Sequence, residues 1–118
     1  MKKFFYSVIA LAVLGSSVAF AATTPTTLKG TIICNACATK HKDDLAAEIA
    51  THTKVCVLKG PCSASGFSFY SDGKLKAFNK DSYSKIQDFL KQDSSTLKVE
   101  VQASEENGQL TLVSIKNQ

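Results

Sequence analysis

The N-terminal segment constrains this chain most, because it determines how much of the chain folds and in which compartment. Met1–Lys3 is short and basic, and Val8–Leu14 is apolar without interruption. Ala19–Ala21 offers the small-x-small pattern that signal peptidases cleave. The apolar run is shorter than the ~20 residues that a membrane-spanning helix needs. We therefore expect residues 1–21 to be a signal peptide and the mature protein to be periplasmic or secreted, with no stable membrane anchor after cleavage.

The chain that remains after cleavage, residues 22–118, has the length of one small domain. Such a domain buries a modest apolar core, so a cross-link or a bound metal would add usefully to its stability. Residues 22–27 are polar and contain Pro25, which predicts a flexible lead-in. We expect residues 28–118 to form a single domain.

The composition argues against nucleic-acid binding. The chain has no arginine, the residue whose planar fork recognises phosphates and guanine edges. It also has no tryptophan. We expect no nucleic-acid partner. A protein partner is possible, and the sequence indicates no particular ligand.

The first half of the domain predicts one strand and a helical excursion. Leu28–Ile33 is rich in strand-forming residues and ends at Cys34. Lys42–Thr51 has helical spacing of its apolar residues. Lys54–Leu58 fits either a strand or a tight helical turn, and Gly60–Pro61 is expected to end it.

The next segment predicts a β-hairpin. Gly66–Tyr70 and Lys74–Phe78 flank Asp72–Gly73, a dipeptide that suits a two-residue type I′ turn. With that turn Phe67 lies opposite Phe78. Their shared sheet face is therefore predicted to be core.

The last segment predicts a helix capped by Asp81 and then two strands. The strands, Leu97–Ala103 and Leu110–Ile115, are joined by a turn at Asn107–Gly108, and a change of phase predicts a bulge or a longer loop near Leu112–Val113. Five strands with a helix between the third and the fourth predict a mainly β fold with one or two helices. It would be a five-stranded OB-like barrel or, alternatively, a small open α+β sheet.

All cysteines and histidines of the chain gather in one short stretch, which is the main indication of function. They form a Cys-x2-Cys-x3-His pattern followed by a His-x3-Cys-x5-Cys pattern. The six residues are Cys34, Cys37, His41, His52, Cys56 and Cys62. Three interpretations compete.

The first interpretation is a pair of structural disulfides, which is what four cysteines in a small exported domain usually form. The pairing is open. A bridge that closes a loop of ~20 residues would contribute about 3 kcal/mol. The protein would then be a disulfide-stabilised, non-enzymatic binding or interaction module of unknown ligand.

The second interpretation is a metal site for zinc or copper, the only cofactors that the sequence indicates. Cys34 and Cys37 could supply half of a tetrahedral zinc site and Cys56 and Cys62 the other half. Alternatively, His52 and Cys56 could join Cys34 or Cys37. Soft thiolates also suit Cu(I).

The two histidines are expected not to share an ion. One continuous helix from His41 to His52 would separate the two rings by roughly 16 Å. Each metal would then have at most one histidine ligand.

The third interpretation is thiol–disulfide exchange at Cys34–Cys37, the only enzymatic alternative; otherwise we expect no enzyme. A helix N-terminus after such a motif lowers the pKa of its thiol. Here the helix predicted from Lys42 begins too far from Cys37 for a strong effect.

Two stretches, His52–Leu58 and Cys62–Phe67, resemble small exported bacterial domains with a His-Thr-x-x-Cys-x-Leu…Cys-x-Ala-Ser-Gly pattern. The resemblance implies an OB-like fold and no assigned activity. It also singles out His52, Cys56, Cys62 and a cysteine near the end of the first strand. One histidine with three cysteines suits a zinc-type site, whereas the even number of cysteines favours disulfides.

Cleavage after Ala21 is directly testable, because signal peptidases require a small residue before the cut. The whole chain, expressed in a bacterium with a periplasm, should yield a periplasmic protein whose intact mass and N-terminal sequence begin at Ala22. Ala21→Trp should slow or abolish the cleavage. A cytoplasmic protein that retains residues 1–21 would contradict the signal-peptide interpretation.

Overall fold

The structure, a computed structural model, describes residues 24–118; the expected signal peptide, residues 1–21, lies outside them. The helices and strands, which include one short 3-10 helix (η1), are β1 (Thr26–Cys34), α1 (Asn35–Lys40), α2 (Leu45–Thr51), α3 (Lys54–Leu58), α4 (Gly60–Ser65), β2 (Phe67–Ser71), β3 (Lys74–Ala77), η1 (Lys80–Ser82), α5 (Tyr83–Leu90), β4 (Lys98–Glu106) and β5 (Gln109–Asn117).

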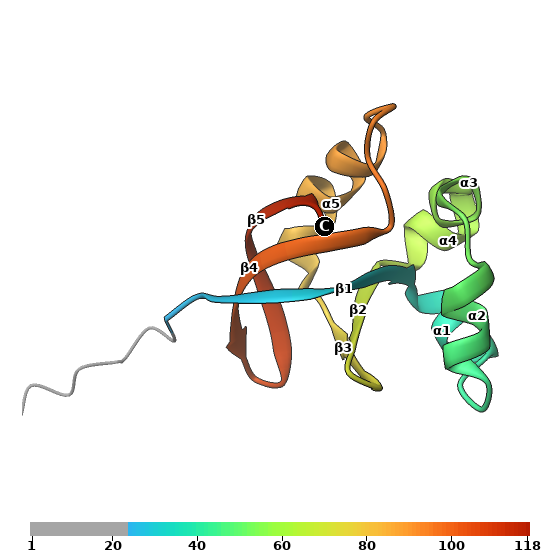
Figure 1. Cartoon of the computed structure of the whole chain (residues 1–118), viewed down its shortest axis with the longest axis horizontal. Helices are drawn as coiled ribbons and strands as arrows, with labels where there is room; N and C mark the ends of the chain where they lie inside the picture. Colours follow the sequence, from blue (N-terminus) through green and yellow to red (C-terminus); the bar gives the residue numbers. More distant parts are fainter. Residues whose placement is uncertain (1–23) are drawn as a thin grey trace, which may run out of the picture.

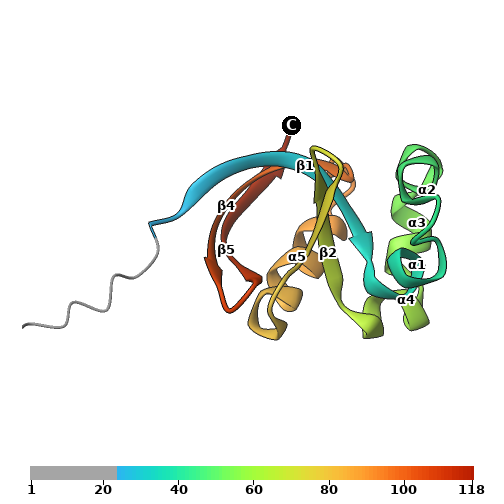
Figure 2. The same cartoon turned by 90° about the horizontal axis from the view of Figure 1, so that it is seen from below.

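The strands form one antiparallel sheet in the order β3-β2-β1-β4-β5. The edge strands β3 and β5 approach each other at an isolated bridge between Phe78 and Leu110. Because only this single bridge and no strand ladder joins β3 to β5 in the described residues, the sheet is open, which agrees with the α+β alternative; the OB-like barrel stays a prediction. Figure 2 shows the sheet curving around α5, which follows β3 as expected.

Both predicted turns are present. Asp72 and Gly73 have φ values of 51° and 74°, as a type I′ turn requires, and the register places Tyr70 opposite Leu75. Asn107–Gly108 joins β4 to β5 in the same way. In β5, Ser114 pairs with Gln102 and Leu112 with Ala103, so Val113 is the extra residue of the predicted bulge.

The core lies between the concave face of the sheet and α5. Phe67 and Phe78 are buried as predicted. Phe69 is buried with them and meets Phe78 edge to face with ring centres 6.1 Å apart. Ile86 and Leu90 of α5 are fully buried against them. Through these contacts α5 packs in one core with residues of β1, β2, β4 and β5.

The cap of α5 differs from the expectation. Asp81 lies in the 3-10 turn η1, and the N-cap residue is Ser82. The Ser82 hydroxyl is buried and accepts a hydrogen bond from the Leu112 amide of β5 at 2.9 Å. The cap position is therefore taken by the residue that also satisfies a buried strand amide.

The connection from β1 to β2 is more helical than expected, since it contains α1 to α4. The helix predicted over Lys42–Thr51 begins only at Leu45, and Lys54–Leu58 is helical. Gly60–Pro61 begins α4 rather than ending an element, because proline is well tolerated in the first turn of a helix. The expected lead-in is also shorter, because Thr26 already pairs with β4.

The four short helices lie together beyond the end of β1, apart from the curved part of the sheet (Figure 1). Lys54 connects them to the loop after α5. Its ammonium group donates to the carbonyl oxygens of Gln92 and Ser95, both at 2.9 Å, and to the Ser95 hydroxyl at 3.2 Å. Such charge-assisted hydrogen bonds fix α3 against the loop that follows α5.

Gly66 offers a sharp test of this packing. Its φ of +87° is in the region that favours glycine, and a Cβ there would overlap the Tyr83 ring. Gly66→Ala should destabilise the protein by about 2 kcal/mol or more, which lowers the melting temperature of a domain this size by at least ~8 °C. Gly60→Ala is the matched control, because a Cβ at that position would have no neighbour within 4 Å and the substitution should change stability by less than about 0.5 kcal/mol. Equal melting temperatures for the two variants would contradict the packing.

Candidate metal centre

The strand β1 delivers two of the cysteines. Cys34 is its last residue, is fully buried and is the N-cap residue of α1. Cys37 lies in the first turn of α1. A helix therefore begins directly after Cys34, and the expectation that the first helix after the motif starts only at Lys42 is wrong.

Hydrogen bonds between α1 and α4 bring a third cysteine to the same place. The Asn35 side-chain amide donates to the Ser65 carbonyl at 2.9 Å, and the Ser65 hydroxyl accepts from the Ala36 amide at 3.0 Å. The same hydroxyl donates to the Cys62 carbonyl at 2.6 Å. Ser65 thus caps the beginning of α1 and the end of α4 together, which holds Cys62 beside the α1 cysteines.

The linker between α2 and α3 supplies His52 and Cys56. His52 is the C-cap residue of α2. Thr53 is the N-cap of α3, and its hydroxyl accepts from the Cys56 amide at 3.3 Å. This cap explains the His-Thr-x-x-Cys sequence, because the threonine sets the turn that places both ligand residues on the cluster side.

The sulfur and imidazole atoms form two overlapping groups. The ligand atoms of Cys34, Cys37 and His52 lie within 4.8 Å of one another, and so do those of Cys37, Cys56 and Cys62. Five of the six residues singled out from the sequence are therefore together, and Cys37 belongs to both groups.

The sulfur spacing suits a metal better than a disulfide. The Sγ atoms of Cys37 and Cys62 are 3.7 Å apart. A disulfide needs about 2.05 Å. A tetrahedral zinc–thiolate site with Zn–S bonds of about 2.3 Å has a sulfur–sulfur edge of about 3.8 Å. All four cysteines within residues 24–118 are free thiols, so the expected disulfides are not formed in this structure.

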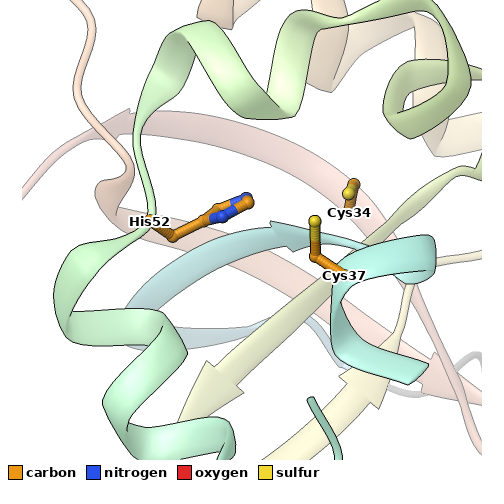
Figure 3. Close-up of side chains that lie close together, drawn as sticks. All are labelled: Cys34, Cys37 and His52. Atoms are coloured by element: carbon orange, nitrogen blue, oxygen red, sulfur yellow. The ribbon is translucent and has the colours of Figure 1, made fainter. Parts of the chain in front are cut away.

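His52 has the arrangement of a ligand histidine. Its side chain is 1% exposed, and Nδ1 lies 3.2 Å from Oε1 of Glu48. Nε2 is buried without a hydrogen-bond partner, which is true of no other buried side-chain nitrogen or oxygen in the described part of the chain. Figure 3 shows the ring directed toward Cys34 and Cys37. A carboxylate on Nδ1 fixes the tautomer that leaves a lone pair on Nε2, which is the form in which histidine can bind a metal.

His41 stands outside the cluster. Its Nε2 lies 3.5 Å from Oε2 of Glu48 and its Nδ1 lies 3.5 Å from Oδ1 of Asp44. The continuous helix assumed between His41 and His52 is absent, because α1 ends at Lys40 and the chain turns before α2. Both rings consequently contact the same carboxylate, yet only His52 is among the grouped ligands.

The surroundings of Cys37 and Cys62 favour the protonated form of these two thiols. Burial, followed by hydrogen bonds with Cys34 and Cys62, raises the pKa of Cys37 far above the usual range of a thiol. The hydrogen bond with Cys34, followed by burial, raises the pKa of Cys62. A metal ion would have to displace these protons. The raised pKa of Cys37 disfavours this residue as the attacking thiolate of a thiol–disulfide exchange.

Sequence reasoning missed Glu48, Asn35 and Ser65. Glu48 had a readable signal, because it precedes His52 by four residues on a helix and so lies on the same face. Asn35 and Ser65 had none, because their roles depend on contacts between residues about thirty positions apart.

Comparisons with family models, curated proteins and solved structures found no match for this chain. The resemblance to exported OB-like domains therefore stays a prediction. Within residues 24–118 none of the helices has the length and apolarity to cross a membrane.

The raised pKa of Cys37 predicts slow alkylation of the reduced, metal-free protein. At a given pH the folded protein holds less Cys37 thiolate than the unfolded chain, so the labelling rate with iodoacetamide should still be rising at pH 10. In urea the same rate should level off near the ordinary thiol pKa of about 8.5. Peptide mapping by mass spectrometry measures both profiles, and coincident profiles would contradict the assignment.

Proposed function

We propose that this protein is a non-enzymatic metal-binding protein whose Cys/His centre holds a soft ion, Zn²⁺ or Cu(I). The observation that carries the proposal is the His52 ring, whose buried Nε2 lacks a partner while Nδ1 is held by Glu48. A buried polar atom without a partner costs about 1–3 kcal/mol. A metal ion between this nitrogen and the neighbouring sulfurs would remove that cost.

The donor atoms determine the class of ion. Thiolate and imidazole ligands suit zinc and copper, whereas calcium and magnesium require oxygen ligands. The two groups, Cys34–Cys37–His52 and Cys37–Cys56–Cys62, supply between them four thiol sulfurs and one imidazole, the donor types of many structural zinc sites.

The short helices give the metal a structural role as well. The longest of α1 to α4 has seven residues, and only Ala38 and Val57 of these helices have buried apolar side chains. Helices this short are marginal by themselves. An ion bound by α1, α4 and the linker at His52 would hold them together.

We further propose that the protein works outside the cytoplasm, in the periplasm or after secretion. The support is the basic, apolar and small-x-small pattern of residues 1–21. In an oxidising compartment a bound ion would also protect the thiols, because metal-bound thiolates are less available for oxidation.

A disulfide-stabilised interaction module is the second candidate function. The closeness of Cys37 to Cys62 favours it, because a rotation of these side chains could bring the sulfurs to bonding distance. In that case Cys62→Ser would lower the melting temperature of the oxidised protein more than that of the reduced protein, and the isolated protein would contain no metal.

Matched histidine variants test the metal centre. The reduced mature chain should bind one Zn²⁺ in competition with a chromophoric chelator. Glu48→Gln should weaken binding by about 10–100-fold because it loosens the His52 ring, and His52→Ala should weaken it further. His41→Ala is the control, because His41 contacts the same carboxylate but lies outside the ligand groups.

The variants also define failure of the proposal. Equal zinc affinity for His52→Ala, His41→Ala and the unchanged chain would show that His52 is not a metal ligand. No zinc or copper binding by the unchanged, reduced chain would refute the metal-binding function.

A further inference from the structure

The ligand atoms of the metal centre are grouped around one shared sulfur, and this grouping carries an inference about how many ions the centre holds. Cys34, Cys37 and His52 form one group, called here the inner triad. Cys37, Cys56 and Cys62 form the other, called the outer triad. We propose that the centre binds two Cu(I) ions, one in each triad, with the Cys37 thiolate as the bridge. The inference rests on the proposed metal-binding function.

The number of donors favours two three-coordinate ions. Two such ions that share one ligand need five donors, which is the number present. Two tetrahedral zinc ions that share one ligand would need seven. A single tetrahedral ion would leave one of the five donors unused. Cu(I) accepts three-coordination and prefers soft thiolate ligands, so it matches both the number and the chemistry of these donors.

The sulfur spacing in the outer triad is compatible with a three-coordinate ion. Metal–sulfur bonds of about 2.3 Å in a trigonal plane give a sulfur–sulfur edge of about 4.0 Å. The Cys37 and Cys62 sulfurs are already 3.7 Å apart. Small side-chain rotations would therefore suffice to seat an ion.

The two triads differ in exposure, which predicts different affinities. Cys34 is fully buried and the His52 side chain is 1% exposed, whereas Cys56 and Cys62 are half-buried. The inner triad is also fixed by the Glu48 hydrogen bond to His52. We therefore expect the inner ion to bind more tightly and the outer ion to exchange more readily with solvent-borne ligands.

The experiment is an anaerobic Cu(I) titration of the reduced mature chain against a Cu(I) chelator, followed by native mass spectrometry. The unchanged chain and the control His41→Ala should each hold two Cu(I), whereas Zn²⁺ should bind once. Two double variants each leave one triad complete. Cys56→Ser with Cys62→Ser keeps the inner triad, and Cys34→Ser with His52→Ala keeps the outer one. Each should hold one Cu(I), the former more tightly.

The results separate the two proposals. One Cu(I) at saturation on the unchanged chain would overturn the two-ion inference and leave the metal centre in place. Two Cu(I) on either double variant would overturn the division into triads. Neither Cu(I) nor Zn²⁺ on the unchanged chain would refute the metal-binding function itself. The count on the unchanged chain does not depend on whether a variant folds.

Discussion

The arrangement of the candidate centre depends on the hydrogen bonds that join the beginning of α1 to the end of α4. The Ser65 hydroxyl accepts from the Ala36 amide and donates to the Cys62 carbonyl, while the Asn35 side chain donates to the Ser65 carbonyl. These bonds lie where β1 is followed by α1 and where α4 is followed by β2. Because β1 and β2 are paired, the helices that adjoin them, α1 and α4, are held side by side. The Cys37 and Cys62 sulfurs are consequently held close together.

The positions of the clustered cysteines and of His52 therefore depend on the sheet. The sheet positions two cysteines through β1 and a third through the start of β2, and Lys54 fixes the remaining helices by its bonds to the loop after α5. Glu48 then orients His52 into the space that the sulfurs leave. An ion at that position would complete the only part of the described structure in which a buried side-chain nitrogen or oxygen lacks a partner.

The features that the sequence predicted well are those determined by local chemistry. Asp72–Gly73 and Asn107–Gly108 specify their turns because both positions require positive φ, and the change of phase at Val113 predicted a bulge because strand alternation has a period of two. The helices α1 and α4 were missed because they are only six residues long and are stabilised by contacts between distant segments. The same limit hid Ser65. His52 was recognised as a candidate ligand, but its burial and its bond to Glu48 could only come from the fold.

The most direct test of the metal centre is the intact mass of the mature protein isolated from the periplasm without reductant, first under native and then under denaturing conditions. A native mass that includes bound metal, followed by a denatured mass equal to that of the fully reduced chain, is the result predicted here. A metal-free native mass with a denatured mass about four daltons below the reduced value would mean two disulfides and would contradict it.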